Sequence, residues 1–129
     1  MFLLDYIYGF HYNFNLICSQ IPHNFGFIIR RKFMARKKLT DTEIQSKLGK
    51  LNGWTVENGK LHKEFKFDNF VSAFGFMTQL ALIAESMNHH PEWFNVYNRV
   101  TIDMMTHDAD GISDLDFEFA AHADALSEK

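Results

Sequence analysis

The chain has 129 residues, which is enough for one domain with its own core and too few for two. Its composition of 47% hydrophobic and 22% charged residues excludes general disorder, and the net charge of −3 gives no basic surplus to favour nucleic acid as a direct partner. The single cysteine, Cys18, excludes an intrachain disulfide framework, so we expect a reducing, cytoplasmic location.

The composition changes near Met34. Residues 1–33 hold six of the 14 phenylalanines but only one acidic residue, Asp5. Polar residues interrupt the apolar run too often for a transmembrane helix, and the basic start of a secretory signal is missing. We expect residues 1–33 to be a non-domain extension from a start assigned upstream of Met34, with a targeting segment or a structural piece as alternatives. Residues 34–129 then form the domain, with no membrane partner.

A capping box opens this domain. Thr40 is placed to cap a helix and Glu43 to bond back to it, and apolar residues follow at helical spacing. Gly53 is a suitable stop. We therefore expect a helix over residues 41–51.

A hairpin follows the first helix. Asn58-Gly59 is a strong turn signal, because both central positions of a type I′ turn need positive φ. The turn joins a short strand at 54–56 to an alternating strand at 61–67, whose buried face carries Phe65 and Phe67.

The longest predicted element is a helix over residues 69–87, with Asp68 as its N-cap. Apolar residues at spacings of three and four predict the buried face. The residues of this face are Phe70, Phe74, Met77, Ala81 and Ala84.

Pro91 ends any further helix, and the sequence after it is rich in β-branched and aromatic residues. We expect a short strand near 94–97 and a longer one near 99–106, with a tight reversal around Asn98. A second hairpin follows from this arrangement.

A second capping box, Ser113 with Asp116, predicts a last helix over residues 114–126. Its core face is expected to carry Leu115, Phe119, Ala123 and Leu126. The predicted order is α-β-β-α-β-β-α, an α+β fold in which three helices cover one face of a four-stranded antiparallel sheet. An edge strand of this sheet needs protection, so we also expect assembly with further copies.

Candidate catalytic residues gather around the second hairpin. His89 and His107 are 18 residues apart, so a hairpin that turns near residue 98 brings His107 back beside His89 and His90. Glu85 precedes His89 by four residues and would share its helix face if the helix extends that far. Imidazoles titrate near neutral pH, so these residues suit general acid–base chemistry.

Simpler interpretations remain open for each histidine. His62 and His122 are expected to be ordinary surface histidines, and His11 and His23 lie in the extension. A zinc site formed by three histidines is a further alternative, but metal-type spacing such as His-x-x-x-His is missing. The spacing therefore does not favour a metal site over acid–base chemistry.

One long motif closely resembles the signature of the pterin-4a-carbinolamine dehydratases. The motif comprises Glu85-x-x-x-His89-His90-Pro91-x-Trp93-x-Asn95-x-Tyr97, then Thr106-His107, Gly111 and Asp116. The similarity extends from about Leu39 to Leu126 and includes Leu51-Asn-Gly-Trp54 and Phe65-x-Phe67. Residues 1–33 have no counterpart in it.

The resemblance implies a lyase that dehydrates 4a-hydroxytetrahydropterin to quinonoid dihydropterin and so recycles the tetrahydrobiopterin-type cofactor of aromatic amino acid hydroxylases. It implies catalytic roles for His89, His90 and His107, with His90 as the main base and His89 or His107 as the acid. It also implies a homodimer or homotetramer, and a site that needs no metal and no cofactor. The positions expected to bind the substrate or line its site are Glu85, Pro91, Trp93, Thr106 and Asp116.

Two other functions remain open. Animal members of this family also act as a dimerisation cofactor of a transcription factor, which would be a non-enzymatic role. A member could instead serve another pterin pathway, such as one linked to molybdopterin. The full histidine set favours the dehydratase, because a pure scaffold would not need it.

Overall fold

The structure is a computed structural model that describes residues 36–128. The expectations for residues 1–33 therefore lie outside the described residues. The described chain forms α2 (Asp41–Leu48), β1 (Thr55–Glu57), β2 (Lys60–Lys66), α3 (Phe70–Met87), β3 (Glu92–Val96), β4 (Arg99–Met104), the short 3₁₀ helix η3 (His107–Ala109) and α4 (Asp114–Ser127). The predicted order α-β-β-α-β-β-α is confirmed, with η3 as an addition.

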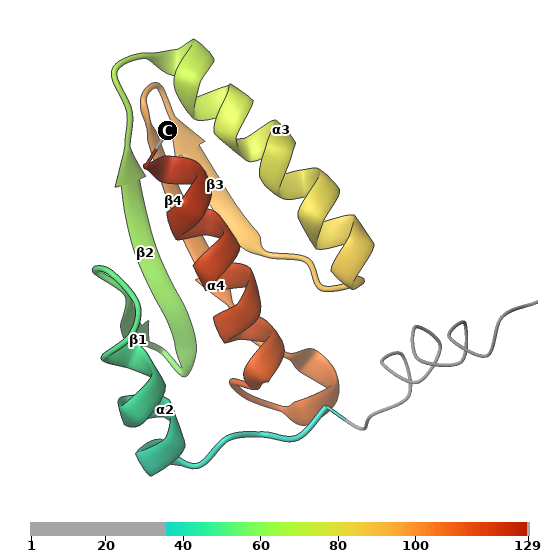
Figure 1. The fold of residues 1–129 in the computed structure, drawn as a ribbon. Helices are drawn as coiled ribbons and strands as arrows, with labels where there is room; N and C mark the ends of the chain where they lie inside the picture. The colour runs from blue at the N-terminus through green and yellow to red at the C-terminus, as the bar shows by residue number, and fades with distance from the viewer. Residues whose placement is uncertain (1–35, 129) are drawn as a thin grey trace, which may run out of the picture. The chain divides into compact units, whose positions relative to one another are not determined.

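The four strands form one open antiparallel sheet in the order β1-β2-β4-β3. Figure 1 shows α3 and α4 side by side across one face of this sheet, with α2 beside β1. The core lies between the sheet and these helices. Its fully buried side chains include Leu61, Leu80, Ile102 and Phe119.

Both predicted hairpins are present. Asn58 and Gly59 have φ values of 51° and 77°, as a type I′ turn requires, and Glu57 pairs with Lys60 directly across it. In the second hairpin Val96 pairs with Arg99, so Tyr97 and Asn98 form the turn. Tyr97 takes the positive φ of 51° there, a strained conformation for a bulky residue, which explains why the sequence signal was weak.

The capping boxes at Thr40 and Ser113 are confirmed, and the last helix ends one residue later than predicted, at Ser127, but the first two helices differ from the prediction in where they end or are capped. The first helix ends at Leu48 rather than at residue 51, with Gly49 as its C-cap. Asn69 rather than Asp68 caps α3, because the Asn69 side chain accepts the Ser72 N–H at 3.0 Å. Either residue type can cap a helix, so the choice depends on the phase at which the helix packs.

The predicted buried face of α3 is largely wrong. The buried residues are Ala73, Phe76, Leu80 and Ala84, whereas Phe70 and Phe74 are 47% and 56% exposed. The helix is apolar on nearly all sides, so its spacing fits more than one face. By length and composition alone α3 could also cross a membrane, but one face of it packs into the core.

Candidate active site

The second hairpin positions the two segments that carry the candidate histidines. The strands β3 and β4 pair antiparallel, with Glu92 opposite Asp103 at the end of the ladder away from the turn. Asn88 ends α3 in the left-handed conformation, with φ 48°, and turns the chain toward His89. The hairpin expected from the sequence therefore brings the 89–90 and 106–107 segments to the same end of the sheet.

A buried hydrogen-bond network links these segments to the start of α4. The Nε2 of His89 lies 2.7 Å from Oδ1 of Asp116, and the hydroxyl of Thr106 donates to Oδ2 of Asp116 at 2.9 Å. The backbone N–H of Ser113 donates to the same Oδ2 at 2.7 Å. His89 is 4% exposed and Thr106 and Asp116 are fully buried, so the network is closed to water.

The network fixes the tautomer of His89. An ionised carboxylate only accepts hydrogen bonds, so Nε2 of His89 is the protonated ring nitrogen and donates to Oδ1 of Asp116. Oδ2 of Asp116 is already occupied by its two donors from Thr106 and Ser113. Asp116 also lies in the first turn of α4, where the helix dipole favours a negative charge.

His90 lies outside this network, on the surface. Its Nε2 lies 3.0 Å from Oε2 of Glu85, and the two side chains are 58% and 83% exposed. The expectation that Glu85 shares a helix face with His89 is corrected, because α3 ends at Met87 and the turn at Asn88 presents His90 to Glu85 instead. A proton on Nε2 leaves Nδ1 of His90 as a free acceptor.

His107 begins η3 and is also exposed. Its loop is closed by backbone hydrogen bonds in both directions between Thr106 and Gly111, at 3.0 and 3.4 Å. The side chains of His89 and His90 each bond to a carboxylate. Among the described residues, the His107 side chain has no such hydrogen bond or ion pair. Thr106, which precedes His107, donates to Asp116, the partner of His89. The side chains of Thr106 and Asp116 therefore connect the backbone at His107 to His89.

The remaining candidate positions are apolar. Pro91 and Trp93 are both half-buried, and Trp93 packs against the core beside β4. The other two described histidines lie apart: His62 bonds to Asp103 at 2.8 Å across the sheet, and His122 is exposed on α4. His11 and His23 lie outside the described residues.

Sequence reasoning missed two residues around this site. Ser113 was identified as a helix cap, but its N–H and hydroxyl also join the Asp116 network. Arg36 reaches the carbonyl of Asn88, directly before His89, and no sequence pattern indicated this contact. The capping box could have pointed to Ser113, because it already fixed Asp116 beside it.

The described part of the chain, 36–128, contains no cluster of three or more His, Cys, Asp or Glu side chains that could hold a metal ion. What the arrangement can provide is acid–base chemistry. It offers two exposed imidazoles, of which His90 is paired with a carboxylate, next to one buried imidazole held by Asp116.

Comparisons with known proteins identify a family and a similar structure. A model of the pterin 4 alpha carbinolamine dehydratase family matches residues 37–126. A relative from Solibacter usitatus, named among the pterin-4-alpha-carbinolamine dehydratases, is 64% identical over 90 residues, which is 70% of this chain and 95% of the relative. One from Rhizobium meliloti, named likewise, is 48% identical over 97 residues, covering 74% of this chain and 93% of the relative.

A solved structure from Brucella melitensis has a similar fold. It is described as a transcriptional coactivator/pterin dehydratase and is 43% identical to this chain. The TM-score is 0.69, and the match covers 70% of this chain and 99% of that one.

Proposed function

The chain belongs to the pterin-4α-carbinolamine dehydratase family, and we propose that it dehydrates 4a-hydroxytetrahydropterin to quinonoid dihydropterin. The observation that carries this proposal is the hydrogen bond between exposed His90 and Glu85, immediately beside the buried pair of His89 and Asp116. A carboxylate that orients an imidazole is a common way to prepare a general base.

The reaction needs one acid and one base. The C4a–O bond breaks, the hydroxyl takes a proton and leaves as water, and a C4a=N5 double bond forms as N5 loses its proton. His90 accepts the N5 proton on Nδ1, because Glu85 holds the other ring nitrogen in its protonated form. His107 donates the proton to the leaving hydroxyl. Both imidazoles are exposed, so water restores their protonation states after each turnover.

The buried residues of the site act on the substrate indirectly. Burial of His89, Thr106 and Asp116 supports a positioning role for all three, because a side chain closed to solvent has little surface to offer a ligand. Their network ties the end of α3 to the start of α4 and sets the backbone from which His90 and His107 project. Pro91 and Trp93 provide the apolar surface on which the flat pterin ring would rest.

The test of this function is the disappearance of synthetic 4a-hydroxytetrahydropterin with the full-length protein. We expect the protein to accelerate the loss well above the spontaneous rate. Binding of a dihydropterin without acceleration would favour a role with another pterin. Neither binding nor acceleration would leave the non-enzymatic function as the better description.

The non-enzymatic function has one observation in its favour. The similar structure from Brucella melitensis is described as a transcriptional coactivator as well as a pterin dehydratase. A dehydratase active site and a binding surface occupy different residues, so both roles can exist in one chain.

We also propose that the protein forms a homodimer or homotetramer through the outward face of α3. This face exposes Phe70, Val71, Phe74 and Leu82, at 47%, 78%, 56% and 71%. The one charged residue of α3 is Glu85, in its last turn. An exposed apolar face that carries no charge before this last turn favours burial against a second copy.

A further inference from the structure

Residues 36–39 lie across the loop that carries His107, and we call this segment the strap. The backbone N–H of Leu39 donates to the carbonyl of Ile112 at 2.8 Å. Lys38 lies directly on Gly111, since a Cβ added at Gly111 would come within 2.6 Å of Cε of Lys38. Gly111 has φ 155° and is buried, so the strap covers a part of the loop where only glycine fits well.

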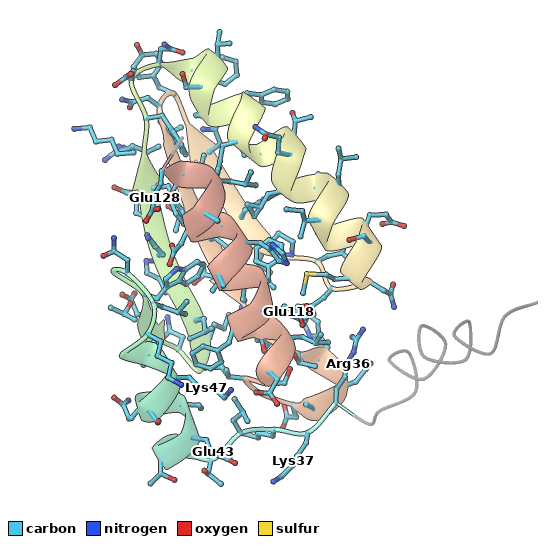
Figure 2. The ribbon with its side chains drawn as sticks, viewed as in Figure 1. Arg36, Lys37, Glu43, Lys47, Glu118 and Glu128 are labelled. Carbon is cyan, nitrogen blue, oxygen red and sulfur yellow. The ribbon has the colours of Figure 1, made fainter. Side chains whose placement is uncertain are left out.

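Arg36, the first residue of the strap, contacts both histidine-bearing segments. Its Nη2 donates to the carbonyl of Asn88 at 2.8 Å, and its Nη1 lies 3.6 Å from Oδ2 of Asp108. Asn88 immediately precedes His89, and Asp108 immediately follows His107. Figure 2 shows Arg36 and its neighbour Lys37 pointing in opposite directions from the strap.

The two contacts of Arg36 differ in strength. The bond to Asn88 is short and charge-assisted, and it holds the peptide group that links a left-handed residue to His89. The ion pair with Asp108 is longer, and the Asp108 side chain is 78% exposed, so water weakens it. Arg36 itself is only 25% exposed, which keeps its guanidinium in place between the two segments.

We propose that Arg36 is a positioning residue that holds the His89-His90 turn and the His107 loop in one fixed arrangement. The inference rests on the proposed function, because in it the Arg36 guanidinium controls the distance between the base His90 and the acid His107. Arg36 lies one residue before the part of the chain that the family model matches, residues 37–126. A misplacement of about 1 Å at a reacting group can lower a rate by roughly a hundredfold.

The experiment compares Arg36→Ala with Arg36→Lys in the full-length protein. Lys37→Ala is the matched control, because it removes the same charge from the neighbouring, exposed position. Steady-state kinetics give kcat and KM for 4a-hydroxytetrahydropterin. Imidazole NMR signals of His90, His107 and His122 report the geometry directly, and circular dichroism confirms folding.

We expect Arg36→Ala to lower kcat by about tenfold or more while KM stays within about twofold, since the wall of the site is unchanged. Arg36→Lys should recover part of the loss, because an ammonium can reach one of the two partners but not both. The His90 and His107 signals should move in Arg36→Ala and stay fixed in Lys37→Ala. His122, on α4, should not respond in either variant.

A folded Arg36→Ala variant with kcat within twofold of wild type would overturn the proposal. If Arg36→Ala does not fold, Arg36→Lys decides by the same criteria, with any loss of kcat below twofold counting against the role. If the wild-type protein has no dehydratase activity, the proposed function fails while the NMR signals still test the strap. Unmoved His90 and His107 signals would then reject it, and displaced signals would support it.

Discussion

Asp116 is the residue on which most of the candidate site converges. One carboxylate receives a donor from each of three chain segments: the His89 ring, the Thr106 hydroxyl and the Ser113 backbone. A buried charge is tolerated only when its lone pairs are used, and no buried side-chain polar atom in the described residues lacks a partner. The residue therefore serves the fold and the site together.

Replacing Asp116 with Asn should destabilise the protein by about 2–4 kcal/mol, because the amide NH₂ faces one of the three donors and the charge is lost. Urea unfolding of the full-length chain measures this change. Asp114→Asn is the control, since Asp114 lies two residues earlier on the same helix, is 75% exposed and pairs with Lys47. It should cost less than about 1 kcal/mol. Equal losses in the two variants would contradict the account.

Glu43 provides a pH-dependent test of the first capping box. Hydrogen bonds from the backbone N–H and the hydroxyl of Thr40 hold the pKa of Glu43 below its ordinary value. Because the folded pKa is lowered, the stabilisation is fully present above the ordinary glutamate pKa of about 4.3 and is lost as the pH falls through the folded value. An NMR titration should find a midpoint below 4.3, and Thr40→Ala should move it part of the way back. A wild-type midpoint at the ordinary value would reject the box as the cause.

Local residue patterns were predictable from the sequence where one residue type has one favoured geometry. Asn58-Gly59 and the boxes at Thr40 and Ser113 are such cases, because the backbone conformation requires those side chains. The burial of His89 was not predictable in this way. It depends on a contact with Asp116, which is 27 residues further along the chain, and no local sequence pattern indicates a contact over that separation.

At the scale of elements, α3 has one face in the core and another face that is apolar and exposed. The sequence could not distinguish them, because both faces repeat at helical spacing. The exposed face carries the aromatic residues Phe70 and Phe74, whereas the buried face combines Phe76 and Leu80 with two alanines. Ala73 and Ala84 face inward since a small side chain allows the helix to approach α4 and the strands closely.

Two leucines two positions apart test this orientation. Leu80 is fully buried and Leu82 is 71% exposed. Leu80→Ala should lower the free energy of unfolding by about 2–5 kcal/mol through the cavity it leaves. Leu82→Ala should change the stability of the monomer by under about 0.5 kcal/mol. Denaturant unfolding at low protein concentration measures both, and a larger loss at Leu82 would mean that the face is assigned the wrong way round.

For the whole molecule, the exposed face of α3 decides the state of association. If that face is buried between copies, Phe74→Glu should convert the assembly to smaller species by placing a charge within it. Sedimentation velocity of the full-length chain measures the mass. Lys50→Glu, at an exposed position beyond α2, is a control for the change in charge. A wild-type protein that remains monomeric at high concentration would contradict the proposed assembly.

The fold as a whole was predictable because turn and cap signals divide the chain into elements of clear type. The site was predictable only in part. The hairpin between β3 and β4 carries the two histidine segments to one end of the sheet, but the roles that we propose for the individual histidines depend on their solvent exposure. His89 is closed off while His90 is open, although the two are adjacent in the sequence.

In the mechanism that we propose, exposed His90 and His107 perform the dehydration. The rate of loss of 4a-hydroxytetrahydropterin with single histidine variants of the full-length protein tests this assignment. His90→Ala and His107→Ala should each reduce the enzymatic rate by about a hundredfold or more, because each removes one proton-transfer group. His122→Ala, an exposed histidine on α4, should leave the rate unchanged. Folded His90→Ala and His107→Ala variants that both keep the wild-type rate would contradict the account.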